Sequence, residues 1–184
     1  MAEYYLISQL PSLDGISDNS PLPVTQDRFR ELCSQFLNKK AYKELERLSL
    51  IPSKAEEKSS FSIVEKWNEN ERNLRLALAK LRAEKMNRQY DTDGQLIPAV
   101  FLQYAREAVE IESPMDAEIY LNRCRLQILE ALRPMDSFSD EFVFYYAIKL
   151  MIIERIKKFD ALSGEKAYRN IYDSIMNNDR QEVI

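Results

Sequence analysis

Histidine is absent from this chain of 184 residues, glycine occurs only 3 times and cysteine twice. A chain without histidine cannot use a Ser-His-Asp or Cys-His mechanism, and it cannot bind zinc through imidazole. The glycines lie at Gly15, Gly94 and Gly164, so neither a G-x-G-x-x-G turn nor a P-loop can be written into the sequence. We therefore expect no enzyme activity, no metal and no cofactor.

Long apolar runs are also lacking. The longest, Phe142 to Ile153, is interrupted by Lys149 and falls short of the roughly 20 residues that a membrane-spanning helix needs. The start, Met1 to Tyr5, has no basic region of the kind found in signal peptides. A net charge of -4 and a pI of about 5.1 disfavour general binding to polyanions. These features predict a soluble cytoplasmic protein without membrane insertion.

The two cysteines, Cys33 and Cys124, fall inside apolar helical stripes. Free cysteine is among the most buried residue types, and disulfides are rare in reducing compartments. We expect both side chains to be small buried hydrophobic groups rather than partners in a disulfide.

The composition favours helices over sheets, with 45% hydrophobic and 30% charged residues and little glycine. We predict an all-α fold in which residues 1–184 form a single-domain bundle of about seven helices. Residues 1–24 are expected to be extended chain and loop, although Tyr4 to Ile7 could form a short strand or begin a helix. Residues 177–184 are expected to be a frayed tail.

Apolar residues spaced by three and four predict where the helices lie. The third expected helix, from Phe61 to about Met86, is the longest. The segment Phe142 to Phe159 is apolar almost all round, so we expect it at the centre of the bundle. The other expected helices begin at Thr25, after Asn38, near Pro98, at Ser113-Pro114 and, as a last amphipathic helix, around Tyr168, Ile171, Tyr172 and Ile175.

The segment Asp91-Thr92-Asp93-Gly94 is the nearest approach to a metal-binding motif. Aligning Gly94 with the glycine of an EF-hand loop places Gln89 at the first ligand position and Val100 where a bidentate glutamate is needed. Two of the main carboxylate ligands are therefore missing. We predict a turn between helices and no metal site.

The second half of the long helix, residues 71–88, carries six cations against two anions in an otherwise acidic protein. One interpretation is a surface for an acidic partner, either a protein or, less favourably, nucleic acid. The candidate contacts on this surface, the cationic strip, are Arg72, Arg75, Arg82 and Lys85. The other interpretation is a solvated face with a semi-buried Glu71–Arg75 pair at i, i+4 that fixes helix packing.

The block Trp67-x-x-x-Glu71-Arg72-Asn73-Leu74-Arg75, continuing through Ala77 to Ala83, resembles a small bacterial family. The genes of this family lie within V-type (A/V-type) ATPase operons of Bacteroides-like and chlamydia-like bacteria. The opening Tyr4 to Leu13 is similar to the start of that family, and Lys158-Phe159-Asp160 with Gly164-Glu165 adds weaker support.

This resemblance implies a non-catalytic component of a rotary ATPase, located in the cytoplasm or peripheral to the inner membrane through the complex. Such operons usually encode a C-type subunit (d-type in eukaryotic enzymes), a helical cap that seats the central stalk on the membrane ring. The full C-type cap is much longer and has three helical repeats, whereas this chain shows no repeat. It could replace the cap, form part of it, or assist assembly. The alternative is a free-standing helical module that binds nucleic acid or an acidic protein.

Overall fold

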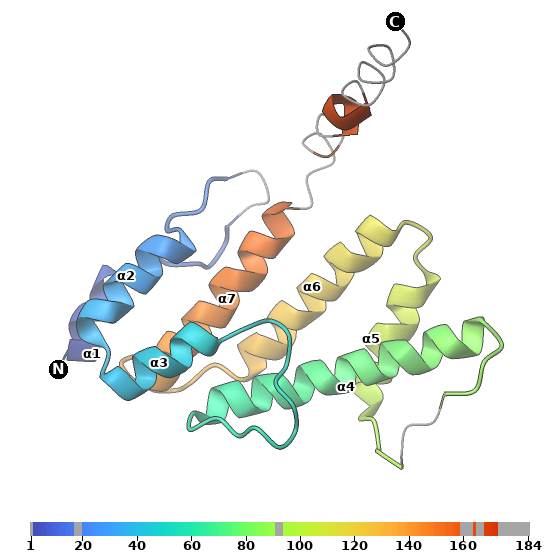
Figure 1. Cartoon of the computed structure of the whole chain (residues 1–184), viewed down its shortest axis with the longest axis horizontal. Coiled ribbons are helices and arrows are strands. Elements are labelled where there is room, and N and C mark those ends of the chain that lie inside the picture. Colours follow the sequence, from blue (N-terminus) through green and yellow to red (C-terminus); the bar gives the residue numbers. More distant parts are fainter. Residues whose placement is uncertain (1, 17–19, 91–93, 159–163, 165–167, 173–184) are drawn as a thin grey trace, which may run out of the picture.

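The computed structural model describes residues 2–16, 20–90, 94–158, 164 and 168–172. This part of the chain is helical and contains no strand, which confirms the predicted all-α bundle (Figure 1). Besides a helical segment at 168–172, its helices are α1 Ala2–Gln9, α2 Gln26–Phe36, α3 Lys39–Arg47, α4 Ser62–Lys85, α5 Ala99–Glu110, α6 Pro114–Ala131 and α7 Asp140–Lys158.

The helix α1, Ala2–Gln9, replaces the extended chain and loop expected within residues 1–24, and it confirms the helix rather than the strand as the alternative for Tyr4 to Ile7. A helix of 8 residues is marginal by itself and needs tertiary packing. Leu6 supplies that packing because it is fully buried in the core, beside partly buried Ile7. The long helix is therefore the fourth in the chain and not the third.

Side-chain caps explain where several helices begin. The Thr25 hydroxyl accepts a hydrogen bond from the Arg28 amide at the start of α2. Asn38 accepts from Ala41 at the start of α3, with a distance of 2.9 Å between Oδ1 and N. Ser113 caps α6, which has a proline in its first turn. These residues satisfy backbone N–H groups that have no partner inside the helix, and they confirm the predicted starts.

The helix α7 is the central element, as its composition predicts. Every residue from Val143 to Leu150 is buried, and so are Ile152 and Ile153. In Figure 1, α7 lies between α1 and α2 on one side and α6 on the other. An almost wholly apolar helix is stable only where other helices cover it on most sides.

The core consists of two hydrophobic clusters. The first joins α1, α2, α3, the start of α4, the end of α6 and α7, and includes Trp67, Leu129 and Cys33. The second joins the rest of α4 to α5 and α6, and includes Leu74, Phe101 and Leu121. Both α4 and α6 contribute to both clusters, so these two helices connect them.

Both cysteine side chains are buried and free, as predicted. Burial raises the pKa of the Cys33 thiol to about 12. Burial also raises the pKa of Cys124.

Three sequence-based expectations concern parts of the chain that are described incompletely or not at all. Residues 168–172 are helical, but Tyr168, Ile171 and Tyr172 are exposed and do not form a buried apolar face. Ile175, the tail 177–184 and Asp91 to Asp93 lie outside the described residues.

Among the described helices, none is both long and apolar enough to cross a bilayer.

Candidate docking surface

The predicted pair of Glu71 and Arg75 is present on α4 and is part of a larger network. Arg75 Nε donates to Glu71 Oε1 at 2.8 Å. The Glu71 side chain is only 1% exposed, whereas that of Arg75 is 43% exposed. A carboxylate buried to this degree needs more than one half-exposed partner.

Arg125 of α6 supplies the second partner of Glu71. Its Nε and Nη2 donate to the two carboxylate oxygens of Glu71, at 2.9 and 3.1 Å. The Arg125 side chain is 6% exposed. This two-point geometry matches the planar guanidinium to the carboxylate and fixes both distance and orientation.

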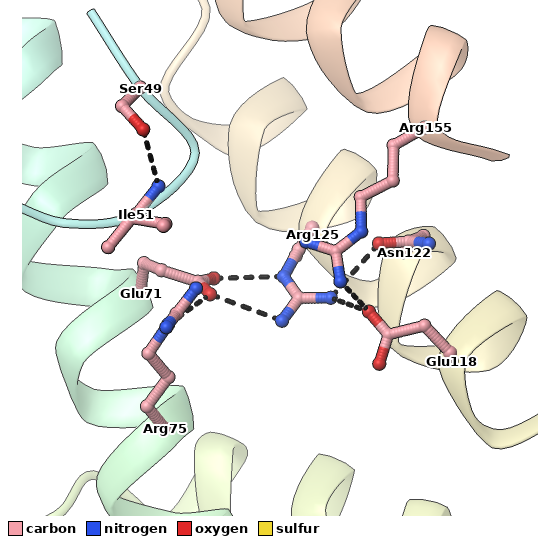
Figure 2. A network of polar contacts seen from close by, with 8 residues as sticks. All are labelled: Ser49, Ile51, Glu71, Arg75, Glu118, Asn122, Arg125 and Arg155. Carbon is pink, nitrogen blue, oxygen red and sulfur yellow. Dashed lines mark hydrogen bonds and ion pairs between the residues drawn. The ribbon is translucent and has the colours of Figure 1, made fainter. Parts of the chain in front are cut away.

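The remaining Arg125 nitrogen extends the network along α6 and to α7. Nη1 donates to Asn122 Oδ1 at 3.0 Å and to Glu118 Oε1 at 3.1 Å. Glu118 also accepts from Arg155 of α7. We call Glu71, Arg75, Glu118, Asn122, Arg125 and Arg155 the ion-pair network (Figure 2). It ties three helices together with charge-assisted hydrogen bonds.

The ion-pair network lies at the junction of the two hydrophobic clusters. On α4, Glu71 stands between Trp67 of the first cluster and Leu74 of the second. On α6, Arg125 stands between Leu121 of the second cluster and Leu129 of the first. Burial alone would lower the pKa of Arg125, but hydrogen bonding and charge attraction from Glu71 raise it overall.

Most of the cationic strip is bonded within the chain. Arg72 Nη1 donates to the Ser53 carbonyl at 2.9 Å, and Lys85 Nζ donates to the Val109 carbonyl at 2.9 Å. Lys85 thereby binds a carbonyl in the last turn of α5, where a cation is favoured by the helix dipole. With Arg75 bonded to Glu71, the strip does not present four free cations.

Arg82 is the exception, since it is exposed and its side chain makes no polar contact within the described residues. Arg88 and several large apolar side chains follow it at the end of α4 and before α5. Met86 is 60% exposed, Tyr90 44% and Leu96 95%. We call Arg82, Met86, Arg88 and Tyr90 the α4 tip. Arginine, methionine and tyrosine are enriched in protein interfaces relative to the rest of the surface.

A second buried charge, Lys149, anchors the N-terminal loop to α7. Its ammonium donates to the carboxylates of Asp14 and Glu130, and to the Tyr145 hydroxyl at 3.3 Å. The hydrogen bond from Lys149 lowers the pKa of Asp14. Burial alone would raise the pKa of Glu130, but the hydrogen bond from Lys149 lowers it overall. These contacts hold the loop at Asp14 and the helix α6 at Glu130 against α7.

The sequence contained signals for both buried charges. Arg125 directly follows Cys124 and lies four residues after Leu121, so it falls on the apolar side of its helix. Lys149 lies in the middle of the longest apolar run. A cation in such a position needs an acidic partner, because an unpaired buried charge is strongly disfavoured. The identity of that partner depends on tertiary structure.

No group of three or more potential metal-ligating side chains occurs in the described part of the chain. No protein-family model, curated protein or solved structure matches this chain.

Proposed function

We propose that this protein is a non-catalytic structural, coupling or assembly component of a bacterial V-type rotary ATPase. It would act by docking helix surfaces onto other subunits of the central stalk or membrane ring. The proposal rests on the resemblance of the block from Trp67 to Ala83. The structural observation that supports a docking role is the α4 tip, where exposed Arg82 lies one helical turn before exposed Met86.

The structure narrows the surface that is available to a partner. Arg72, Arg75 and Lys85 already bond to groups of this chain. Reversing the charge of Arg75 would disturb the buried Glu71 and therefore the fold. The side chains of Arg82 and Met86 can be changed without such losses, because both are exposed.

The test is co-purification of the tagged protein with identified ATPase subunits from cells in which it occurs naturally. The variant Arg82→Glu with Met86→Ser should recover the subunits about tenfold less well, or worse, because it removes two exposed side chains of the types enriched in interfaces. The matched control is Lys66→Glu, an exposed cation near the other end of α4. Circular dichroism should show equal helicity in all three proteins.

Two outcomes would contradict this function. One is recovery of no ATPase subunit with the unmodified protein. The other is salt-dependent retention of that protein on RNA or DNA, which would favour the nucleic-acid module because phosphate contacts release counterions.

A further inference from the structure

A cavity of about 560 Å³ lies between α3, the segment 48–61 and the first turns of α4. In Figure 1 this segment passes over the start of α4. Sites for small molecules have volumes of about 300–1,000 Å³, so the cavity has room for a metabolite. It is separate from the α4 tip, which lies at the opposite end of α4.

The charge of this cavity is opposite to that of the whole chain. Four cations line it, and two carboxylates, Glu44 and Glu57, leave its lining with a net charge of +2. The chain as a whole has a net charge of -4. Three of the cations share one side of α3 because they are spaced by three and four residues. The four cations are Lys40, Lys43, Arg47 and Lys58. We call this site the basic cavity.

The four cations are available to a ligand. All four are exposed, and none forms an ion pair or side-chain hydrogen bond with another described residue. By contrast, Glu44 is already engaged, since its Oε1 accepts from the Ser59 hydroxyl and, at 3.1 Å, from the Ser60 amide. One of the two carboxylates in the lining is thus held by the loop.

The wall of the basic cavity is fixed by buried polar contacts. Asn68 is only 6% exposed, and its Nδ2 donates to Ser53 Oγ at 3.1 Å. Arg72 donates to the carbonyl of the same serine. These bonds hold the loop against α4, so the site does not depend on ligand-induced ordering, which would reduce affinity. Its apolar surface comes from Leu48, Ile51 and Val64.

We propose that the basic cavity binds a phosphate ester with an apolar or aromatic body, of the nucleotide class. Lysine and arginine side chains are the usual partners of phosphate oxygens in proteins. The net charge of +2 matches the charge of a phosphate monoester near neutral pH. The apolar wall would contact the body of the ligand. This site is independent of the proposed ATPase role.

The test is calorimetric titration of the full chain with ADP, pyrophosphate, inorganic phosphate and adenosine at low salt. We expect ADP to bind more tightly than pyrophosphate, and adenosine to bind least. In the variant Lys43→Gln with Arg47→Gln, the affinity for ADP should fall about tenfold or more, because two charge-assisted contacts are lost. The control Lys39→Gln with Lys54→Gln removes two exposed cations from the same segments but outside the cavity lining. It should change the affinity less than about twofold.

Three results would overturn the proposal. The first is the absence of ADP and pyrophosphate binding at millimolar concentration. The second is an equal loss of affinity in the control, which would indicate diffuse attraction to surface cations. The third is equal affinity for ADP and pyrophosphate, which would contradict contact with the apolar wall. Thermal unfolding of each variant shows that the fold is retained, since the substituted side chains are exposed.

Discussion

Arg125 binds both carboxylate oxygens of Glu71, at 2.9 and 3.1 Å, across the junction between two hydrophobic clusters. The two residues are 54 positions apart in the sequence. Removal of one partner from a buried pair leaves the other charge without compensation, which costs more than the pair itself contributes.

We expect the variants Glu71→Leu and Arg125→Met each to lower the free energy of unfolding by about 3–5 kcal/mol. The combination Glu71→Leu with Arg125→Met should cost less than the sum of the single changes, because it leaves no unpaired charge between these positions. Urea denaturation at pH 7 measures all three. The exposed Glu84→Gln on the same helix is the control and should change stability by about 0.5 kcal/mol or less. A loss below about 1 kcal/mol in both single variants would mean that the pair behaves like a surface salt bridge.

The anchor at Lys149 makes stability depend on pH. Asp14 and Glu130 have lowered pKa values in the fold because of Lys149. A carboxyl with a lowered folded pKa stabilises the protein above its unfolded pKa of about 4, and this contribution is lost as the pH falls through the folded value. The variant Glu130→Gln should therefore be less stable than the natural protein at pH 7, and the difference should shrink toward pH 2.

The same ammonium gives the opposite dependence at high pH. Burial alone would lower the pKa of Lys149, but the hydrogen bonds that it donates to the two carboxylates raise it overall. Its contribution is complete below the unfolded pKa of about 10.4 and is lost only as the pH rises through the folded value. The midpoints of urea denaturation, measured from acid to alkaline pH, test both dependences of stability on pH. The exposed Glu69→Gln variant is the control. A difference that stays constant from pH 7 to pH 2 would contradict the carboxylate assignment.

The cysteines should be inert while the protein is folded. Burial raises the pKa of Cys33 to about 12 and also raises that of Cys124, and the thiolate is the reactive form. We expect neither thiol to react with Ellman's reagent at pH 8 in the native state, and both to react in denaturant. Rapid reaction of either one without denaturant would show that its side chain reaches solvent.

Asn87 ends α4 with a left-handed backbone conformation at a φ of 54°. The amides of Asn87 and Arg88 donate to the carbonyls of Glu84 and Ala83, at 3.0 and 2.9 Å, which is the Schellman pattern. The variant Asn87→Gly should keep or slightly raise the melting temperature. Asn87→Val should lower stability by about 1–2 kcal/mol, because a side chain with a branched Cβ is strained there. Equal melting temperatures for these two variants would contradict the left-handed conformation of Asn87 at the end of α4.

The helical framework could be predicted from local patterns. Thr25, Asn38 and Ser113 marked helix starts because their side chains cap backbone groups a few residues away. The apolar composition of α7 predicted its central position. Both kinds of signal, capping residues and apolar composition, can be recognised within a single helix. Local pattern left the segment of α1 undecided between a strand and a helix, because the stability of α1 comes from the burial of Leu6 against distant elements.

The candidate site was less predictable, because side-chain partners depend on tertiary structure. The pairing of Glu71 with Arg75 follows from i, i+4 spacing, but the pairing with Arg125 does not. The helical pattern alone leaves Lys85 and Arg72 available, yet α5 and the 48–61 segment bring backbone carbonyls to them. The basic cavity was missed because its cations come from two segments that the fold places together.

The junction between the two clusters also has a mechanical consequence. A slip of one helical turn between α4 and α6, about 5.4 Å, would separate the Arg125 guanidinium from the Glu71 carboxylate inside an apolar interior. The barrier to such sliding is the cost of leaving two buried charges without a partner. A force applied to α5 would therefore be transmitted to α1, α2 and α3, because α4 and α6 move together as rigid helices.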